Sequence, residues 1–289
     1  MRCLFCKSPS DSARSVEHIV PESLGNRRHV LPKGAICDSC NNYFAREVEG
    51  PVLSHPSLKN LRAWYREPTK KGRFPALTGV HIGTDIEVSL NVSDSGAYNL
   101  GPYGIDPLQQ RHRERLLNSI AMEEPLGGPG FGFIFQDDMP AREMSRFLAK
   151  MALEVVYLRL GSELHDFLID SDHYDRIRNW ARRGDNYDAW PFHKRRIFPD
   201  ETLMRHPSTG AWVRVGFAYD LLLTSRPETF FAFCIFGTEY VINVGGPSIK
   251  GYEQWLKEYD GQSPLIEQKG MHLRVGHREG EVQYFLDEN

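Results

Sequence analysis

The sequence predicts an α+β protein in which a small zinc-stapled ββα unit precedes a larger mixed α+β domain. Three observations lead to this fold class. Two Cys-x-x-Cys pairs stand 30 residues apart near the N-terminus, the residues between them read as strand, loop and strand, and the remaining chain mixes strand and helix patterns. With 289 residues, of which 40% are hydrophobic and 25% charged, the chain can bury a normal core and form two domains.

Four of the five cysteines form the two pairs, Cys3 with Cys6 and Cys37 with Cys40. Each Cys-x-x-Cys turn directs two sulfurs at one ion. A chain without a secretion signal is expected in the cytosol, where disulfide bonds are disfavoured. We therefore expect one structural Zn²⁺ held by four thiolates. The fifth, Cys234, lies in the apolar run FFAFCIF and is expected to be a buried strand thiol.

The interval between the cysteine pairs predicts a hairpin that leads to a helix. Residues 15–20 read as a short strand, 21–28 as a loop and 29–36 as an irregular second strand. A helix over 41–48 begins directly after the second cysteine pair. Zinc therefore closes a strand, loop, strand and helix into one small unit.

Closing this unit on zinc brings the end of the first strand against the start of the helix. Glu17 and His18 are then expected to face Asn41 and Asn42. Carboxylate and amide oxygens suit a hard divalent cation, and a neutral imidazole can deprotonate water near pH 7. Asn42 is the weaker candidate, because Asn at a helix start is often only a cap.

Three sequence elements resemble the HNH, or ββα-metal, endonucleases, in the subset with two zinc knuckles. CLFC, EHIVPESLG and CDSCNN are similar, in order and spacing, to that family's Cys-x-x-Cys, acid-His-Ile-x-Pro-x-x-x-Gly and Cys-x-x-Cys-His/Asn elements. The resemblance covers about residues 1–50. It implies a metal-dependent DNA endonuclease in which His18 is the general base and Glu17 and Asn41 hold a catalytic Mg²⁺ or Mn²⁺.

One departure from the family concerns its middle Asn, which helps to orient the histidine. That residue would fall near Leu31 to Gly34, where the sequence has no Asn. Asn26, His29 or a backbone carbonyl are the substitutes that the sequence leaves open. The alternative to a nuclease is therefore a catalytically inactive, zinc-dependent nucleic-acid-binding or adaptor module.

Positive charge is concentrated in the N-terminal part of the chain. Residues 1–75 contain 13 Lys and Arg against 7 Asp and Glu, whereas the rest contains 22 against 31. In KNLRAWYREPTKKGRFP, basic side chains alternate with aromatic ones, which is typical either of a phosphodiester-binding segment or of an amphipathic helix followed by a linker. The residues that we expect to contact DNA are Arg66, Lys70, Lys71 and Arg73.

The same basic segment predicts the domain boundary. We expect residues 1–72 to form the HNH nuclease domain with its zinc and basic linker, and residues 73–289 to form an α+β recognition or regulatory domain. The patterns predict, in order, a hairpin over 77–92, helices over 143–161 and 173–184, two strands over 211–224 and 229–246 paired across the turn SRPE, and a helix over 248–259.

The second domain carries no readable chemistry, so we expect it to bind a protein partner or a small activating ligand, and a homo-oligomer stays open. Because unrestrained cutting would damage a host genome, the family resemblance also implies a role in bacterial defence against phage or foreign DNA. No run of about 18 apolar residues and no signal-peptide pattern occurs, so we expect a cytoplasmic protein without a membrane span.

Overall fold

The structure is a computed structural model. It describes residues 1–65, 67–69, 72–81, 86–92, 98–102, 114, 118, 131–132, 139–160, 164–198, 204–205, 212–266, 273–274 and 282–286. Two compact units are distinguished, one formed by Met1–Val52 with Pro140–Asn289 and the other by Leu53–Met139. The N-terminal segment therefore packs together with the C-terminal half of the chain. The expected boundary after residue 72 is a boundary between domains that fold independently. The division into compact units is a different property, so this boundary stays a prediction.

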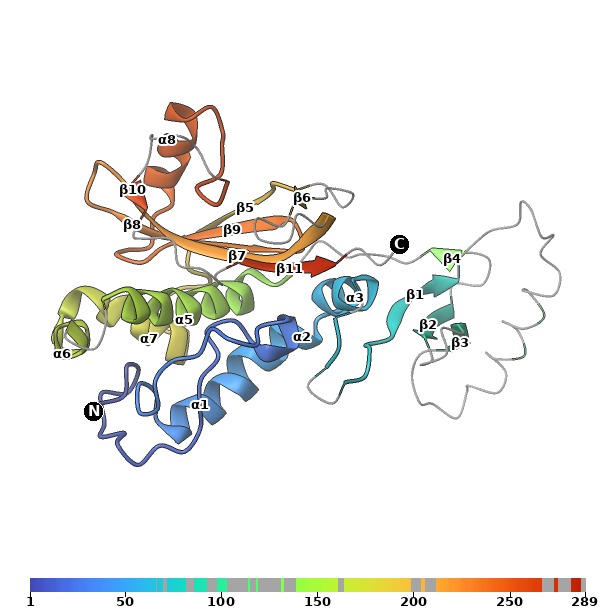
Figure 1. The fold of residues 1–289 in the computed structure, drawn as a ribbon, viewed down its shortest axis with the longest axis horizontal. Helices are drawn as coiled ribbons and strands as arrows, with labels where there is room; N and C mark the ends of the chain where they lie inside the picture. The colour runs from blue at the N-terminus through green and yellow to red at the C-terminus, as the bar shows by residue number, and fades with distance from the viewer. Residues whose placement is uncertain are drawn as a thin grey trace. The chain divides into compact units, whose positions relative to one another are not determined.

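The first unit is built on a seven-stranded antiparallel sheet (Figure 1). The strand order is β10-β7-β8-β9-β5, and β6 and β11 also pair with β7. The strands are β5 (Phe192–Arg196), β6 (Met204–Arg205), β7 (Trp212–Leu223), β8 (Thr229–Ile235), β9 (Thr238–Asn243), β10 (Leu273–Arg274) and β11 (Val282–Leu286). The expected pairing across the turn SRPE is confirmed, because β7 and β8 are antiparallel neighbours.

The expected strand over 229–246 is in fact two strands, β8 and β9, joined by a tight turn. Phe236 and Gly237 form this turn, and both have positive φ values, 46° and 82°. That combination fits a two-residue hairpin whose twist matches the flanking strands. A Cβ at Gly237 would lie 2.3 Å from the carbonyl oxygen of Phe198, so this position requires glycine.

Helices cover both faces of this sheet, with α5 (Ala141–Leu160) on one side and α8 (Lys250–Glu258) on the other (Figure 1). Phe233 of β8 packs edge-on against Phe147 of α5, with ring centroids 6.4 Å apart. Its neighbour Ala232 belongs instead to the cluster around Trp255 of α8. Because both faces are buried, β8 is a continuous apolar run rather than an alternating one. Cys234 is buried within it, as expected.

Helix α5 confirms the long helix that the sequence predicts, and it is buried on nearly all sides. Between Met144 and Tyr157, every residue except Arg146 is buried. Such burial is typical of a helix in the middle of a core. The other helical segments of this unit are η1 (Glu22–Leu24), α1 (Asp38–Phe44), η2 (Ala45–Glu49), α6 (His165–Asp170), η4 (Asp172–Tyr174) and α7 (Asp175–Arg183). Helix α2 (Gly50–Ser54) continues from η2.

The hairpin before α1 is less regular than the sequence indicates. The two expected strands reduce to one bridge between His18 and Val30. Hydrogen bonds from the backbone N–H of Ile19 to the carbonyl of His29, at 3.1 Å, and from that of Leu31 to the carbonyl of Glu17, at 2.9 Å, flank this bridge. The paired part is therefore short, and it is centred on His18.

The second unit contains α3 (Pro56–Trp64) and a four-stranded antiparallel sheet of order β3-β2-β1-β4. Its strands are β1 (Leu77–His81), β2 (Ile86–Val92), β3 (Tyr98–Pro102) and β4 (Phe131–Gly132). The hairpin expected over 77–92 is confirmed by the pairing of β1 with β2. Buried Asn60 joins α3 to this sheet, since its amide donates to the carbonyl of Thr78 at 2.7 Å. Within the described part of the chain, no helix has the length and apolar character that crossing a membrane requires.

Candidate active site

The four cysteines of the two knuckles lie together. The sulfur atoms of Cys3, Cys6, Cys37 and Cys40 are all within 4.8 Å of one another, and those of Cys6 and Cys37 are 3.6 Å apart. Zn–S bonds of about 2.3 Å in a tetrahedron place sulfurs roughly 3.8 Å apart. The donor set and its spacing therefore fit one zinc ion.

Backbone hydrogen bonds shape both knuckles. In the first, the N–H of Lys7 donates to the carbonyl of Cys3 at 2.9 Å. In the second, the sulfur of Cys37 caps helix α1 by accepting from the N–H of Cys40 at 3.4 Å. The hydrogen bond between the Cys40 thiol and Cys3 lowers the pKa of Cys3 and raises that of Cys40, so Cys3 is the member of this pair that ionises first.

The hairpin that carries the candidate site has one buried and one accessible face. Glu17 and Leu31 are buried, whereas Val16 and Val30 are 41% and 37% exposed. His18 is half-buried and lies opposite Val30 in the bridge. Because side chains alternate along an extended backbone, His18 belongs to the accessible face and Glu17 to the buried face.

Asn41 lies against the strand that carries Glu17 and His18. Its amide nitrogen is 3.4 Å from the carbonyl oxygen of Val16, to which it donates. Asp38, at the start of the same helix, accepts from the backbone N–H groups of Arg14 and Ser15 at 3.0 and 2.9 Å. These contacts join the helix to the start of the first strand, at residues 14–16, rather than to its end as expected, and the facing of Glu17 and His18 with Asn41 and Asn42 stays a prediction. Asn42 is exposed.

The loop between the two strands is held by Asn26, which is buried. Its amide nitrogen donates to the carbonyls of Val20 and His29, at 2.7 and 2.9 Å. Its side-chain oxygen accepts from the backbone N–H groups of Arg28 and His29, at 3.1 and 2.8 Å. One carboxamide therefore makes four hydrogen bonds across the hairpin loop. Gly25, with φ 91°, ends η1 just before it.

Glu17 belongs to a buried ionic cluster that we call the Lys150 cluster, formed by Lys150, Glu17, Glu49 and Glu154. The Lys150 ammonium, which is fully buried on α5, hydrogen-bonds Oε1 of Glu17 and lies 2.8 Å from Glu49 and 3.2 Å from Glu154. Burial alone would lower the pKa of Lys150, but the three carboxyl groups raise it well above its ordinary value. Burial raises the pKa of Glu154 well above its usual range.

The oxygen donors of Glu17 and Asn41 are of the kind that Mg²⁺ and Mn²⁺ prefer. A carboxylate can bind a metal through one oxygen while the other accepts a hydrogen bond, which is common among metal ligands. The contact of Lys150 with Oε1 of Glu17 is compatible with that arrangement. The donor chemistry of the two residues therefore suits a divalent cation, and their assignment as its ligands stays a prediction.

The C-terminal half of the chain contacts the hairpin at a second point. The hydroxyl of Tyr219, in β7, lies 2.9 Å from Nδ1 of His29. Burial, together with the charge of Arg28, lowers the pKa of His29 to about 4. A neutral His29 can accept a hydrogen bond from the tyrosine hydroxyl, so the hairpin and the sheet are joined through this pair.

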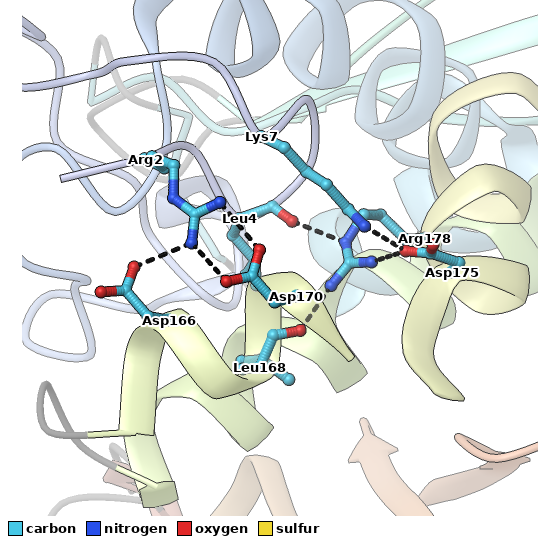
Figure 2. A network of polar contacts seen from close by, with 8 residues as sticks. All are labelled: Arg2, Leu4, Lys7, Asp166, Leu168, Asp170, Asp175 and Arg178. Carbon is cyan, nitrogen blue, oxygen red and sulfur yellow. Dashed lines mark hydrogen bonds and ion pairs between the residues drawn. The ribbon is translucent and has the colours of Figure 1, made fainter. Parts of the chain in front are cut away.

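The first knuckle is docked on α6 and α7 by charged side chains (Figure 2). Arg2 binds Asp166 and Asp170, at 3.0 and 2.8 Å. Buried Arg178 donates to the carbonyl of Leu4 at 2.8 Å, and it also binds Asp175. The zinc-binding segment is therefore attached to the C-terminal half near the cysteines as well as near Glu17.

Sequence reasoning missed the contacts with the C-terminal half, among them those of Lys150, Tyr219 and Arg178. One local signal existed for Lys150, because a lysine with Glu154 four positions later interrupts the apolar pattern of α5. No such signal exists for Tyr219 or Arg178, which lie far along the chain from the residues they contact.

The expected DNA contacts can be located only in part. Arg73 is exposed in the second unit, and its carbonyl accepts from the N–H of Thr69 at 2.8 Å. Arg66, Lys70 and Lys71 lie outside the described residues. The role of all four in binding DNA stays a prediction.

Comparison with known proteins identifies the N-terminal segment. Residues 3–57 match the family model described as HNH endonuclease. Neither the curated proteins nor the solved structures provide a match to the chain. The matched segment begins at the first cysteine of the zinc cluster and includes the hairpin and the helix with Asn41. Residues 3–57 of this chain are therefore similar to the HNH endonuclease family, and we call this segment the HNH domain.

Proposed function

We propose that this chain is a metal-dependent endonuclease that hydrolyses phosphodiester bonds of DNA, with His18 as the general base. The observation that carries the proposal is the position of His18. It lies half-buried on the accessible face of a hairpin that zinc-binding residues precede and follow. A half-buried imidazole can reach water while the bridge to Val30 fixes its backbone.

Asn26 takes the part of the family's middle Asn in this proposal. The sequence leaves Asn26, His29 and a backbone carbonyl as substitutes, and four hydrogen bonds across the loop favour Asn26. His29 is engaged with Tyr219 instead. By fixing the loop between the strands, Asn26 keeps the second strand in register with His18.

Glu17 and Asn41 are the residues that would hold Mg²⁺ or Mn²⁺. Such a cation, when bound, offsets charge on the phosphate and on the leaving oxygen. The residues of the chain supply the rest of the site. His18 accepts a proton from water, Asn26 holds the loop, and the four cysteines hold the frame through zinc.

DNA is the proposed substrate, and Arg66, Lys70, Lys71 and Arg73 are proposed contacts with its backbone. The C-terminal half is proposed to supply recognition or control, through a protein partner or a small activating ligand. Support for control comes from its direct contacts with the hairpin at Glu17 and His29. A role in defence against phage or foreign DNA follows from the need to restrain such an enzyme.

A second candidate is the inactive zinc-dependent nucleic-acid-binding or adaptor module. One observation favours it, because the carboxylate of Glu17 faces the ammonium of Lys150 in a buried cluster. In an inactive frame, this ion pair would be purely structural. The two candidates differ in whether the protein cleaves DNA at all.

Incubation of the purified protein with plasmid DNA and Mg²⁺ or Mn²⁺ tests the proposal, with EDTA as one control and His18→Ala as the other. We expect cleavage by the parent and a loss of roughly 10²- to 10⁴-fold in the variant, as removal of a general base predicts. Zinc content and thermal unfolding should match the parent. An equal rate in His18→Ala would overturn the proposed mechanism, and DNA binding without cleavage would establish the inactive module.

A further inference from the structure

The Lys150 cluster joins the HNH domain to a helix outside it. Lys150 lies on α5, 133 positions after Glu17 and beyond the matched residues 3–57. Its side chain is fully buried, and its ammonium hydrogen-bonds Oε1 of Glu17. It also lies 3.4 Å from the carbonyl oxygen of His18. One cation from the C-terminal half thus contacts both residues of the Glu-His pair.

We propose that Lys150 is a positioning residue of the nuclease site, which orients the Glu17 carboxylate and the His18 backbone. This inference rests on the proposed function, in which Glu17 holds the divalent cation and His18 activates water. Lys150 itself touches neither the substrate nor the metal. It fixes the direction of a ligand, as hydrogen-bonded partners of metal-binding carboxylates commonly do.

The geometry supports positioning rather than simple charge neutralisation. The Lys150 ammonium lies 3.2 Å from the carboxylate of Glu154, on the same helix, and 2.8 Å from the carboxylate of Glu49 in η2. These two contacts hold the ammonium in place independently of Glu17. The side chain has no exposed surface, so water does not compete for its donors. A rigid donor of this kind restricts the rotamers open to the Glu17 side chain.

The position of Lys150 also connects the hairpin to the core of the C-terminal half. Its helix α5 lies between the sheet, which it contacts through Phe147, and the hairpin, which it contacts through Lys150. A shift of α5 would therefore move the Glu17 partner directly. Any control that the C-terminal half exerts on cleavage can act through this helix.

The variant Lys150→Met tests the inference. The protein is loaded with zinc at the four cysteines, and the binding of added Mn²⁺ is measured by electron paramagnetic resonance. We expect the dissociation constant for Mn²⁺ to rise roughly 10- to 100-fold, the loss typical when a partner of a metal ligand is removed. The Mn²⁺ concentration for half-maximal cleavage should rise in parallel. A matched control is Arg178→Met. It removes another buried cation that joins the N-terminal segment to the C-terminal half, but Arg178 contacts Leu4 and not Glu17 or His18. It should lower stability but leave Mn²⁺ affinity unchanged.

The outcomes separate the inference from the proposed function. Unchanged Mn²⁺ affinity in Lys150→Met would make the cluster purely structural, and tighter binding would make Lys150 a competitor of the metal; either result overturns the inference. The binding measurement needs no turnover, so absence of cleavage by the parent would refute the nuclease alone. If Lys150→Met does not fold, Lys150→Arg decides, since it keeps the charge but changes the donor geometry. Weaker Mn²⁺ binding with full zinc content supports positioning, and parental affinity overturns it.

Discussion

The hydroxyl of Tyr219 and Nδ1 of His29 lie 2.9 Å apart, and they join the central sheet to the hairpin of the HNH domain. The two residues are 190 positions apart in the sequence. Their rings meet edge-on, with centroids 5.5 Å apart. A neutral His29 can accept at Nδ1 from the hydroxyl, whereas a protonated His29 would donate to it, so the direction of this hydrogen bond depends on the charge of the imidazole.

The first prediction concerns the pH dependence of stability. Burial lowers the pKa of His29 from 6.5 to about 4, whereas the unfolded chain keeps the ordinary value. Between these values the unfolded state binds more protons, so stability rises with pH. The contribution of His29 is complete above pH 6.5 and is lost as the pH falls towards 4. In urea unfolding at pH 7 and pH 4.5, His29→Gln should therefore lose less stability on acidification than the parent.

Tyr219→Phe is the control for this prediction. It removes the hydroxyl but keeps an aromatic ring beside His29, so burial still lowers the pKa of the imidazole. Its stability should fall at both pH values while the pH dependence stays close to that of the parent. An identical pH dependence in the parent and in His29→Gln would contradict the prediction.

The second prediction concerns Asn26. Replacing it by Ala removes its four hydrogen bonds, which include the donor to the carbonyl of Val20 and the acceptor for the N–H of His29. Leaving such groups without partners costs roughly 1–3 kcal/mol of unfolding free energy each. We expect Asn26→Ala to be clearly destabilised in urea unfolding, and Asn26→Asp as well, since a carboxylate cannot donate to Val20. Asn42→Ala, on the exposed side of α1, should change stability by at most about 0.5 kcal/mol.

The grouping of the four cysteines could be predicted from the sequence because its signals are local, whereas the helix begins at Asp38, inside the second cysteine pair, and not at Asn41 as predicted. A Cys-x-x-Cys turn fixes two sulfurs by backbone geometry alone, and Cys37 caps the helix that follows it. The meeting of Asn41 with the first strand follows from closing that frame. Local spacing therefore carries the core of the candidate site.

The rest depends on contacts between distant parts of the chain. The role of Lys150 requires the packing of α5 against the hairpin, and spacing within α5 cannot reveal it. The turn between β8 and β9 was also missed, because Phe236 adopts a positive φ that bulky side chains rarely adopt. Without an Asn-Gly or Asp-Gly signal, two short buried strands read as one long apolar strand.

The third prediction concerns zinc. Native mass spectrometry should find one zinc ion per chain, and Cys3→Ser or Cys37→Ser should lose it together with the fold of residues 1–50. The physical reason is that binding of a structural zinc contributes roughly 10 kcal/mol or more, much of which depends on all four thiolates. Cys234→Ala, in buried β8, is the matched control and should keep its zinc. A well-folded parent without zinc would remove the four-cysteine site.

The last prediction separates the two proposed metal ligands. Glu17→Gln should raise the Mn²⁺ concentration for half-maximal cleavage more than Asn41→Ala does, because a carboxylate contributes a full charge to a hard cation and a carboxamide does not. Glu17→Gln should also lower the thermal stability more than Asn41→Ala does. Glu17 is buried in contact with Lys150, whereas Asn41 is only half-buried and makes a long contact of 3.4 Å with Val16. Cleavage measured over a series of Mn²⁺ concentrations, alongside thermal unfolding, gives both quantities. If Glu17→Gln loses stability but keeps the metal dependence of the parent, Glu17 serves the Lys150 cluster alone, and another group must hold the metal beside Asn41.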